Sequence, residues 1–329
     1  MVDRPRQRVV HLTDDTTAGG VMRVIDHITR GSGMDNDAEH TMRHVQRAQV
    51  SFQKIEADVI VSHLSISWRT LPSLVALRLR HANAKLIHVE HSYTEGFVRH
   101  NVRSPRRFFA LLRIGFGLFD RIVAVSAAQE AWILRNRLKS GDKLHLIRSY
   151  ADLTPFLELP QRTGKIRHLA AIGRLDHQKG FDLLIAAFRA TKDADLRLSI
   201  FGVGEQERML RNLAKGDERI RFEGFAKSPT SAYQDIDAVI MPSRWEAYGL
   251  VAIEALSAGC ELFCRDVDGL RDHARFGAQL FDDDSFNFGA LNGAGALDSR
   301  PTSYNRGQLV QQLAAENNAG WKGLCQSLG

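Results

Sequence analysis

The chain carries, from residue 241 to residue 259, the stretch Met241-Pro-Ser-Arg-Trp-Glu-Ala-Tyr-Gly-Leu-Val-Ala-Ile-Glu-Ala-Leu-Ser-Ala-Gly259. The apolar run 238–241 predicts a strand that ends at a proline, and the apolar run 250–258 predicts a helix that stops at a glycine. Backbone N–H groups at a helix N-terminus favour an anion. Because Glu246 and Glu254 bracket that helix start, the stretch predicts a site that holds a phosphate by its backbone and sugar hydroxyls by its carboxylates.

The same order of strand, loop and helix recurs on both sides of this stretch. It predicts strands at 8–13, 57–61, 84–89, 120–125 and 143–147 in the first half, and at 167–172, 197–201, 220–222, 238–241, 261–264 and 278–281 in the second. Residues 151–164 contain two prolines and a glycine and read as a linker. The chain is therefore expected to be α/β, with a Rossmann-like domain over 1–155 and a second over 165–329.

Composition limits the class of protein. The 329 residues are 44% hydrophobic and 25% charged, which is ordinary for a globular chain with room for two cores. Three cysteines without a CxxC pair favour neither a disulfide framework nor a zinc site, and fit a reducing cytoplasm. The sequence has no run of about 18 apolar residues, so it predicts no membrane span, and its start does not indicate a signal peptide.

Positive charge is concentrated in the first half, where residues 1–160 hold 23 Lys and Arg against 16 Asp and Glu. Much of it lies in the segment 99–116, which places arginines beside an apolar helix opened by Ser104-Pro105. Such a segment can lie on an anionic bilayer or receive a phosphorylated lipid. An ordinary core helix with a solvated basic face explains it equally well.

Several loop residues of the first half follow predicted strands, where ligands of open α/β sheets bind. Gly19 and Gly20 open the first helix and would let a ligand approach its N-terminus, although a paired glycine also makes a tight turn. His63 and His91 each follow a strand, although a lone loop histidine is more often a surface or capping group than a site residue.

In the second half, Arg174 and Lys179 stand five residues apart in the turn after the first strand. Two cations there suit a diphosphate, although charged loop tips are also simply solvated. Glu254 lies inside an apolar helix and needs a hydrogen-bonding partner. That partner is either a ligand or a salt bridge to Arg244 or a neighbouring residue.

The patterns at 173–184, 201–204, 222–225 and 242–255 together resemble the retaining glycosyltransferases of the GT-B fold, the large family-4 group. The resemblance is strong over 165–285 and looser in the first half. It implies two Rossmann-like domains facing a cleft, with a terminal helix near 308–321 that crosses back onto the first. It also implies a metal-independent transfer of a hexose from a nucleotide sugar, favoured as a UDP-hexose, with no cofactor.

The resemblance further implies roles for particular residues. Arg174 and Lys179 would bind the diphosphate with help from backbone N–H groups near Gly249 and Leu250, and Glu254 would accept from the ribose hydroxyls. Glu246 would hold a hydroxyl of the donor sugar.

Three further sets of residues complete the implied site. Gly224 and Phe225 would border the base, His91 would reach the sugar near the reacting carbon, and Gly19-Gly20 would close over the phosphate. Asp282-Asp-Asp284 is expected to be a solvated loop and not a metal site.

The acceptor is expected to be lipid-linked or a poly- or oligosaccharide, and the protein cytoplasmic, at the inner face of the membrane if the basic segment binds there. Two other classes stay open. One is a sugar-nucleotide epimerase of similar architecture, and the other is a non-enzymatic protein that binds anionic lipid or nucleic acid. This second class leaves Glu246, Glu254 and the turn at 173–180 unexplained, and nucleic acid is the less favoured partner.

Overall fold

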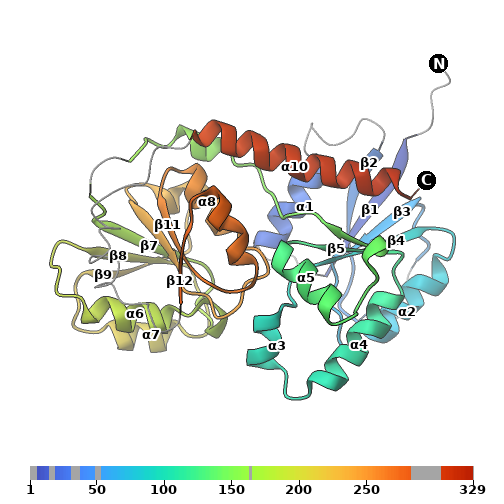
Figure 1. Cartoon of the computed structure of the whole chain (residues 1–329), viewed down its shortest axis with the longest axis horizontal. Coiled ribbons are helices and arrows are strands. Elements are labelled where there is room, and N and C mark those ends of the chain that lie inside the picture. Colours follow the sequence, from blue (N-terminus) through green and yellow to red (C-terminus); the bar gives the residue numbers. More distant parts are fainter. Residues whose placement is uncertain are drawn as a thin grey trace. The chain divides into compact units, whose positions relative to one another are not determined.

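The computed structural model describes residues 6–14, 19–30, 38–48, 53–162, 165–282 and 305–328. They form two compact units, which we call unit 1 (Met1–Ala151 and Leu313–Gly329) and unit 2 (Asp152–Gln312). Each unit is an α/β layer structure built on one parallel sheet (Figure 1). The predicted fold class, α/β with two Rossmann-like halves, is confirmed.

Unit 1 is built on a six-stranded sheet in the order β2-β1-β3-β4-β5-β6, in which every neighbouring pair is parallel. Its strands are β1 (Gln7–Thr13), β2 (Ala38–His44), β3 (Val59–Ser62), β4 (Lys85–Glu90), β5 (Arg121–Ala124) and β6 (Leu144–Leu146). Its helices are α1 (Gly20–Arg30), α2 (Leu71–Arg80), α3 (Glu95–Asn101), α4 (Pro105–Gly117), α5 (Ala127–Arg135), the short 3₁₀ helix η1 (Gly141–Lys143) and the greater part of α10 (Arg306–Gln326).

The two faces of this sheet have different neighbours because side chains alternate along each strand. Leu12, Ile60 and Leu86 point to the face where α2, α4 and α5 close a continuous apolar core. His11 points to the opposite face, where its ring meets the ring of Trp321 from α10 edge-on, with centroids 5.8 Å apart. The His11 ring is therefore buried on one face of the sheet, and the main core lies on the other.

Unit 2 repeats the architecture with the sheet order β12-β11-β10-β7-β8-β9, again parallel throughout. Its strands are β7 (His168–Ile172), β8 (Arg197–Phe201), β9 (Ile220–Gly224), β10 (Ala238–Met241), β11 (Glu261–Arg265) and β12 (Gln279–Phe281). Its α-helices are α6 (Phe181–Ala190), α7 (Glu207–Ala214) and α8 (Leu250–Ser257), and its 3₁₀ helices are η2 (Thr154–Glu158), η3 (His177–Lys179), η4 (Pro229–Tyr233) and η5 (Asp268–Phe276). The stretch around Met241–Gly259 thus consists of β10, a loop and α8, as the sequence predicts.

Four expectations about local structure need correction. The poorly patterned region 31–56 contains the strand β2, and the expected linker 151–164 contains the 3₁₀ helix η2. The sequence predicts a helix near residue 232, but the structure has only the 3₁₀ helix η4 there. The apolar spacing of 181–190 predicts that Leu183, Leu184 and Phe188 are all buried, but Leu183 is 40% exposed while the other two are buried.

The long helix α10 contributes residues up to Gln312 to unit 2 and residues from Leu313 onward to unit 1. Its buried positions recur at intervals of three or four, as in an amphipathic helix. Within the described part of the chain, no helix is both long enough and apolar enough to cross a membrane.

Candidate functional site

Two loops of unit 2 that follow neighbouring strands, β7 and β10, meet at the edge of the sheet. At the end of the β7 loop, Gly180 has a φ of +66°, and a Cβ atom added there would come within 2.2 Å of the carbonyl oxygen of Pro242. Only glycine allows this backbone approach. The approach brings the cation of the first loop next to the carboxylate of the second.

Lys179 and Glu246 are the pair brought together. Lys179 Nζ lies 2.5 Å from Glu246 Oε2, and the two side chains are only 14% and 12% exposed. The Ser243 hydroxyl also donates to Glu246 Oε2, at 3.2 Å. The carboxylate thus has two hydrogen-bonding partners in a site largely shielded from water. The sequence prediction that these two residues share one site is consistent with this contact.

Arg174 does not join that pair. Its side chain is 73% exposed, and the guanidinium contacts Asp176 at 3.2 Å and Gln178 at 3.2 Å. It lies on the same β7 loop as Lys179, so a bound anion can draw it away from these weak, solvated partners.

Helix α8 begins beside the pair. Gly249 occupies its N-cap with a φ of +88°, and Leu250 is its first residue. The turn before it is fixed by His273, whose Nε2 donates to the Tyr248 carbonyl at 2.7 Å. Burial lowers the pKa of His273 to about 4, so this ring anchors the turn as a neutral group.

Glu254 lies on the first turns of α8 and is buried. The Tyr233 hydroxyl donates to its Oε2 at 2.7 Å. The alternative salt bridge to Arg244 is wrong, because the Arg244 guanidinium binds Asp182 at 2.6 Å. Glu254 therefore has the hydrogen-bonding partner that a carboxylate in an apolar helix needs, and that partner is a tyrosine.

Gly224 and Phe225 lie at the end of β9. Gly224 has a φ of +72° and its carbonyl accepts from the backbone N–H of Gly202 at 2.7 Å. The Phe225 ring is 66% exposed, so it offers an uncovered aromatic surface.

The remaining predicted residues lie in unit 1. Gly19 and Gly20 are exposed at the start of α1. His91 follows β4, and its Nε2 lies 2.8 Å from Nδ1 of His63, the other histidine predicted from its position after a strand. Of the three aspartates at 282–284, residues 283 and 284 lie outside the described residues.

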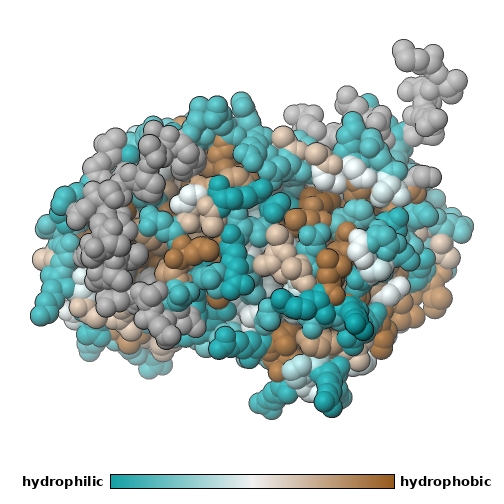
Figure 2. Space-filling model, viewed as in Figure 1, coloured by the Kyte–Doolittle hydropathy of each residue, from teal (hydrophilic) through white to brown (hydrophobic). Residues whose placement is uncertain are grey.

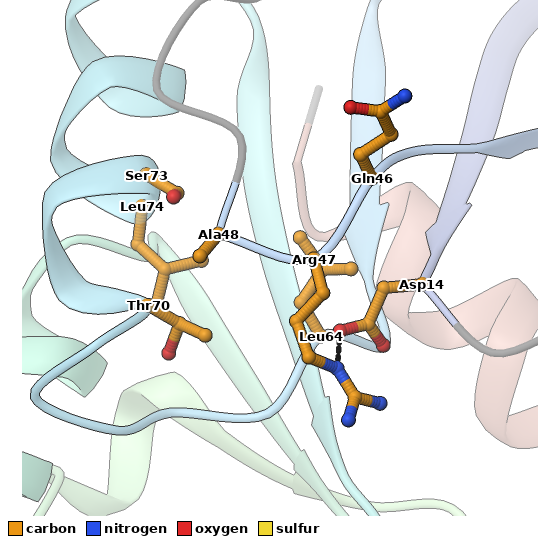
Figure 3. Close-up of a pocket in the computed structure, with 8 residues that line it drawn as sticks. All are labelled: Asp14, Gln46, Arg47, Ala48, Leu64, Thr70, Ser73 and Leu74. Carbon is orange, nitrogen blue, oxygen red and sulfur yellow. Dashed lines mark hydrogen bonds and ion pairs between the residues drawn. The ribbon is translucent and has the colours of Figure 1, made fainter.

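A narrow recess of about 10 Å³ also lies in unit 1, at the ends of β1 and β3 (Figure 3). Its rim carries an ion pair between Arg47 Nε and Asp14 Oδ2 at 2.8 Å. The space holds about one water molecule and no larger ligand.

The electrostatics of the two units differ. In unit 1 burial lowers the pKa of His11 to about 3 and that of His91 to about 4, so these imidazoles are neutral at pH 7. In unit 2, burial and the charge of Glu246 raise the pKa of the Cys264 thiol, which makes that thiol a poor nucleophile. No group of three or more His, Cys, Asp or Glu side chains able to hold a metal ion occurs in the described ranges.

Comparison with known proteins identifies the segment that carries this site. Residues 166–287 match the family described as Glycosyl transferases group 1. Over these residues the chain is similar to the group 1 glycosyltransferases. Over 112 residues, which are 32% of this chain and 25% of that protein, the chain is 39% identical to the glycogen synthase of Thermus thermophilus. The chain thus matches about a quarter of the length of that relative.

Solved structures show that the whole chain has the GT-B fold of glycosyltransferases. Sucrose-phosphate synthase from Thermosynechococcus elongatus is 18% identical and superimposes with a TM-score of 0.75, covering 98% of this chain and 99% of its own. The Anabaena protein Alr3699/HepE in complex with UDP-glucose is 15% identical with a TM-score of 0.72, covering 98% of this chain and 100% of its own.

Sequence reasoning missed three residues that the structure connects to the predicted ones. Tyr233 bonds Glu254 from 21 positions away, and no spacing rule links them. His11 bonds the predicted His63, and His40 bonds His11 in turn. The pairing of β1 with β3 would have indicated His11 because both strands were expected. His40 lies on the strand that the sequence did not predict.

Proposed function

We propose that the protein is a retaining glycosyltransferase that moves a hexose from a nucleotide sugar to a lipid-linked or saccharide acceptor without a metal ion. The observation that carries the proposal is the contact between Lys179 and Glu246. It joins a phosphate-binding cation to a sugar-binding carboxylate, next to the start of α8, inside the segment that matches the glycosyltransferase family. UDP is the proposed nucleotide, since the structurally similar Anabaena protein is bound to UDP-glucose.

In this proposal the diphosphate of the donor binds at the β7 loop. Lys179 and Arg174 supply positive charge, and the backbone N–H groups near Gly249 and Leu250 add donors at the helix start. These groups offset the negative charge that grows on the leaving diphosphate, which is the role that a divalent ion has in other enzymes. The acceptor hydroxyl attacks from the face that the diphosphate leaves, and a phosphate oxygen takes its proton.

The other parts of the donor are assigned to the remaining residues. Glu254 accepts from the ribose hydroxyls, and the hydrogen bond from Tyr233 orients its carboxylate. Glu246 holds a hydroxyl of the transferred sugar, and Gly224 and Phe225 border the base. From unit 1, His91 contacts the sugar and Gly19-Gly20 close over the phosphate.

The test is turnover of a panel of UDP-, GDP- and ADP-sugars, followed by release of the nucleoside diphosphate, with and without saccharide and lipid-linked acceptors. Release of UDP with formation of a product that keeps the anomeric configuration is expected. Conversion of the nucleotide sugar to an epimer without transfer would support the epimerase instead. Absence of binding to any nucleotide sugar in a thermal-shift screen would refute the enzymatic proposal.

The membrane surface is the second partner proposed for unit 1. Helix α4 buries Leu111, Leu112 and Phe116 in the core, while its arginines are exposed. Hydrophilic side chains gather at the tip where α3 and α4 meet (Figure 2). Because the apolar face of α4 is already packed in the core, the arginines would bind the membrane electrostatically. In this proposal the protein is cytoplasmic and binds the anionic inner face of the membrane.

Charge reversal tests this partner. Co-sedimentation with vesicles containing anionic lipid should fall when three exposed arginines of unit 1 are changed to Glu, namely Arg103, Arg106 and Arg107. The matched control changes the same net charge on unit 2, at Arg197, Arg208 and Lys215, which are also exposed. An equal loss in both variants would show a general charge effect and no site on α4.

A further inference from the structure

Four histidines of unit 1 form one continuous row of hydrogen-bonded rings. Nδ1 of His40 lies 3.0 Å from Nε2 of His11, Nδ1 of His11 lies 2.9 Å from Nε2 of His63, and Nδ1 of His63 lies 2.8 Å from Nε2 of His91. Neighbouring ring centroids are 5.3, 5.2 and 5.1 Å apart. The rings follow one another end to end, so both nitrogens of His11 and of His63 face a neighbouring ring.

The register of the sheet explains the row. Val9 pairs with His40 of β2 and with Val59 of β3, and Val61 pairs with Ile87 of β4. Residues that pair across parallel strands share a face, and residues two apart on a strand share it too. Positions 40, 11, 63 and 91 are therefore on the same face, in strand order β2-β1-β3-β4, near the carboxyl end.

The buried rings of the row are uncharged. Burial lowers the pKa of His11 to about 3, that of His63 well below its ordinary value, and that of His91 to about 4. A neutral imidazole has one N–H and one lone pair. When neutral rings are joined nitrogen to nitrogen, each must donate to one neighbour and accept from the other, so the tautomer of one ring fixes that of all.

The row has two possible states. In one, every ring carries its proton on Nδ1 and the N–H groups point from His40 towards His91. In the other, every proton is on Nε2 and the direction is reversed. The Glu90 carboxylate lies next to His91 and its charge acts to raise the pKa of His91 against the larger effect of burial. That negative charge favours the state whose N–H end lies at His91.

The outer nitrogen of His91, Nδ1, bonds to no other group among the described residues. It is the nitrogen left for a ligand. We propose that His40, His11 and His63 set the tautomer of His91, so that His91 presents an N–H group at Nδ1 to an oxygen atom of the substrate. They are positioning residues, since only His91 would touch the substrate. The catalytic consequence rests on the proposed transferase function, whereas the tautomer exists without substrate.

Long-range ¹H–¹⁵N correlation spectra of the full-length protein, labelled at histidine, distinguish a ring nitrogen that carries hydrogen from one with a lone pair. Two other histidines serve as internal standards. His81 must carry its proton on Nδ1, which bonds the Leu77 carbonyl, because its Nε2 accepts from the Ile55 N–H. His273 must carry its proton on Nε2, which bonds a carbonyl. His11, His63 and His91 are all expected to carry their proton on Nδ1, as His81 does.

A substitution at the outer end of the row tests the coupling. In His40→Asp, a carboxylate oxygen replaces Nδ1 and can only accept a hydrogen bond, so His11 must donate to it from Nε2. The direction of every hydrogen bond in the row then reverses, and His11, His63 and His91 all carry their proton on Nε2, as His273 does. His40→Asn is the matched control, with the same size and no charge, and keeps the wild-type pattern. If His91 keeps its proton on Nδ1 in His40→Asp, or if the wild-type rings show mixed tautomers, the proposal is overturned.

Turnover supplies the second readout. Loss of one donor at the substrate should make kcat of His40→Asp about tenfold lower than that of His40→Asn. Equal kcat values despite a reversed row would overturn the role given to His91 in the inference. If no variant and not even the wild type turns over a nucleotide sugar, the transferase proposal fails and the spectra alone decide whether the row sets the tautomer.

Discussion

Mild acid should destabilise unit 1 through its buried histidines. His11, His63 and His91 are neutral in the folded state because burial lowers each pKa below the ordinary value of 6.5. Below pH 6.5 the unfolded chain binds protons that the folded unit does not bind until the pH is well below that value. The free energy of unfolding therefore falls as pH falls through this window, and is unaffected by these rings above it.

The size of the effect follows from the shifts. Each pH unit below 6.5 costs about 1.4 kcal/mol for each ring that stays neutral in the folded state, which gives about 2 kcal/mol for one ring at pH 5. Three rings together cost about 6 kcal/mol, which is comparable to the whole stability of a typical domain. Unit 1 should thus be close to its unfolding transition at pH 5.

Urea unfolding at pH 7, 6 and 5 measures this cost. Of the four tryptophans, Trp245 is the one in unit 2, so tryptophan fluorescence of a Trp245→Phe variant reports on unit 1. His63→Gln should reduce the slope of the free energy of unfolding against pH by the equivalent of about one proton, whatever its effect on stability at pH 7. Val61→Ala, buried on β3 just before His63, should lower stability without changing the slope. A change below about 2 kcal/mol between pH 7 and 5 would refute the reasoning.

Three substitutions in unit 2 give separate outcomes. Lys179→Ala should lower kcat about 100- to 1000-fold in the nucleoside-diphosphate release assay. It should also lower the free energy of unfolding by about 3 kcal/mol because Glu246 is left buried and unpaired; normal turnover would reject the phosphate role. Glu254→Gln should weaken donor affinity about tenfold by calorimetry, with unchanged affinity as the contrary result. Gly180→Ala should cost about 2 kcal/mol or more in a urea melt, because its Cβ would meet the Pro242 carbonyl oxygen, and a cost near zero would show that the loop can move aside.

Sequence reasoning predicted the elements whose apolar residues form continuous runs. It placed β10 and α8 correctly because the run 238–241 and the run 250–258 are buried almost throughout. It missed β2, whose seven residues include none that is fully buried, because an edge strand satisfies its backbone through one neighbour and needs no apolar face. It misplaced Leu183, since a ten-residue helix on a sheet buries only one stripe of its surface.

The candidate site was predictable where residues lie close in sequence to a strand end or helix start, as Lys179 and Glu246 do. Their contact depends on β7 and β10 being neighbours in the sheet, although 67 residues separate the two side chains. The bond from Tyr233 to Glu254 was not predictable, because η4 must first be folded against α8. Spacing in the sequence indicates which strand end a residue follows, and only the strand order shows which residues meet.

The two units keep polar groups buried at their strand ends by opposite means, and this has a consequence for how activity responds to pH. Unit 2 buries opposite charges, with Lys179 Nζ 2.5 Å from Glu246 Oε2. Unit 1 buries neutral rings, whose protonation begins to favour unfolding below pH 6.5. As pH falls from 7 to 5, turnover should therefore fail as unit 1 unfolds. A loss of nucleotide binding that precedes the unfolding of unit 1 would show that the ion pair, and not the histidine row, is the acid-sensitive part.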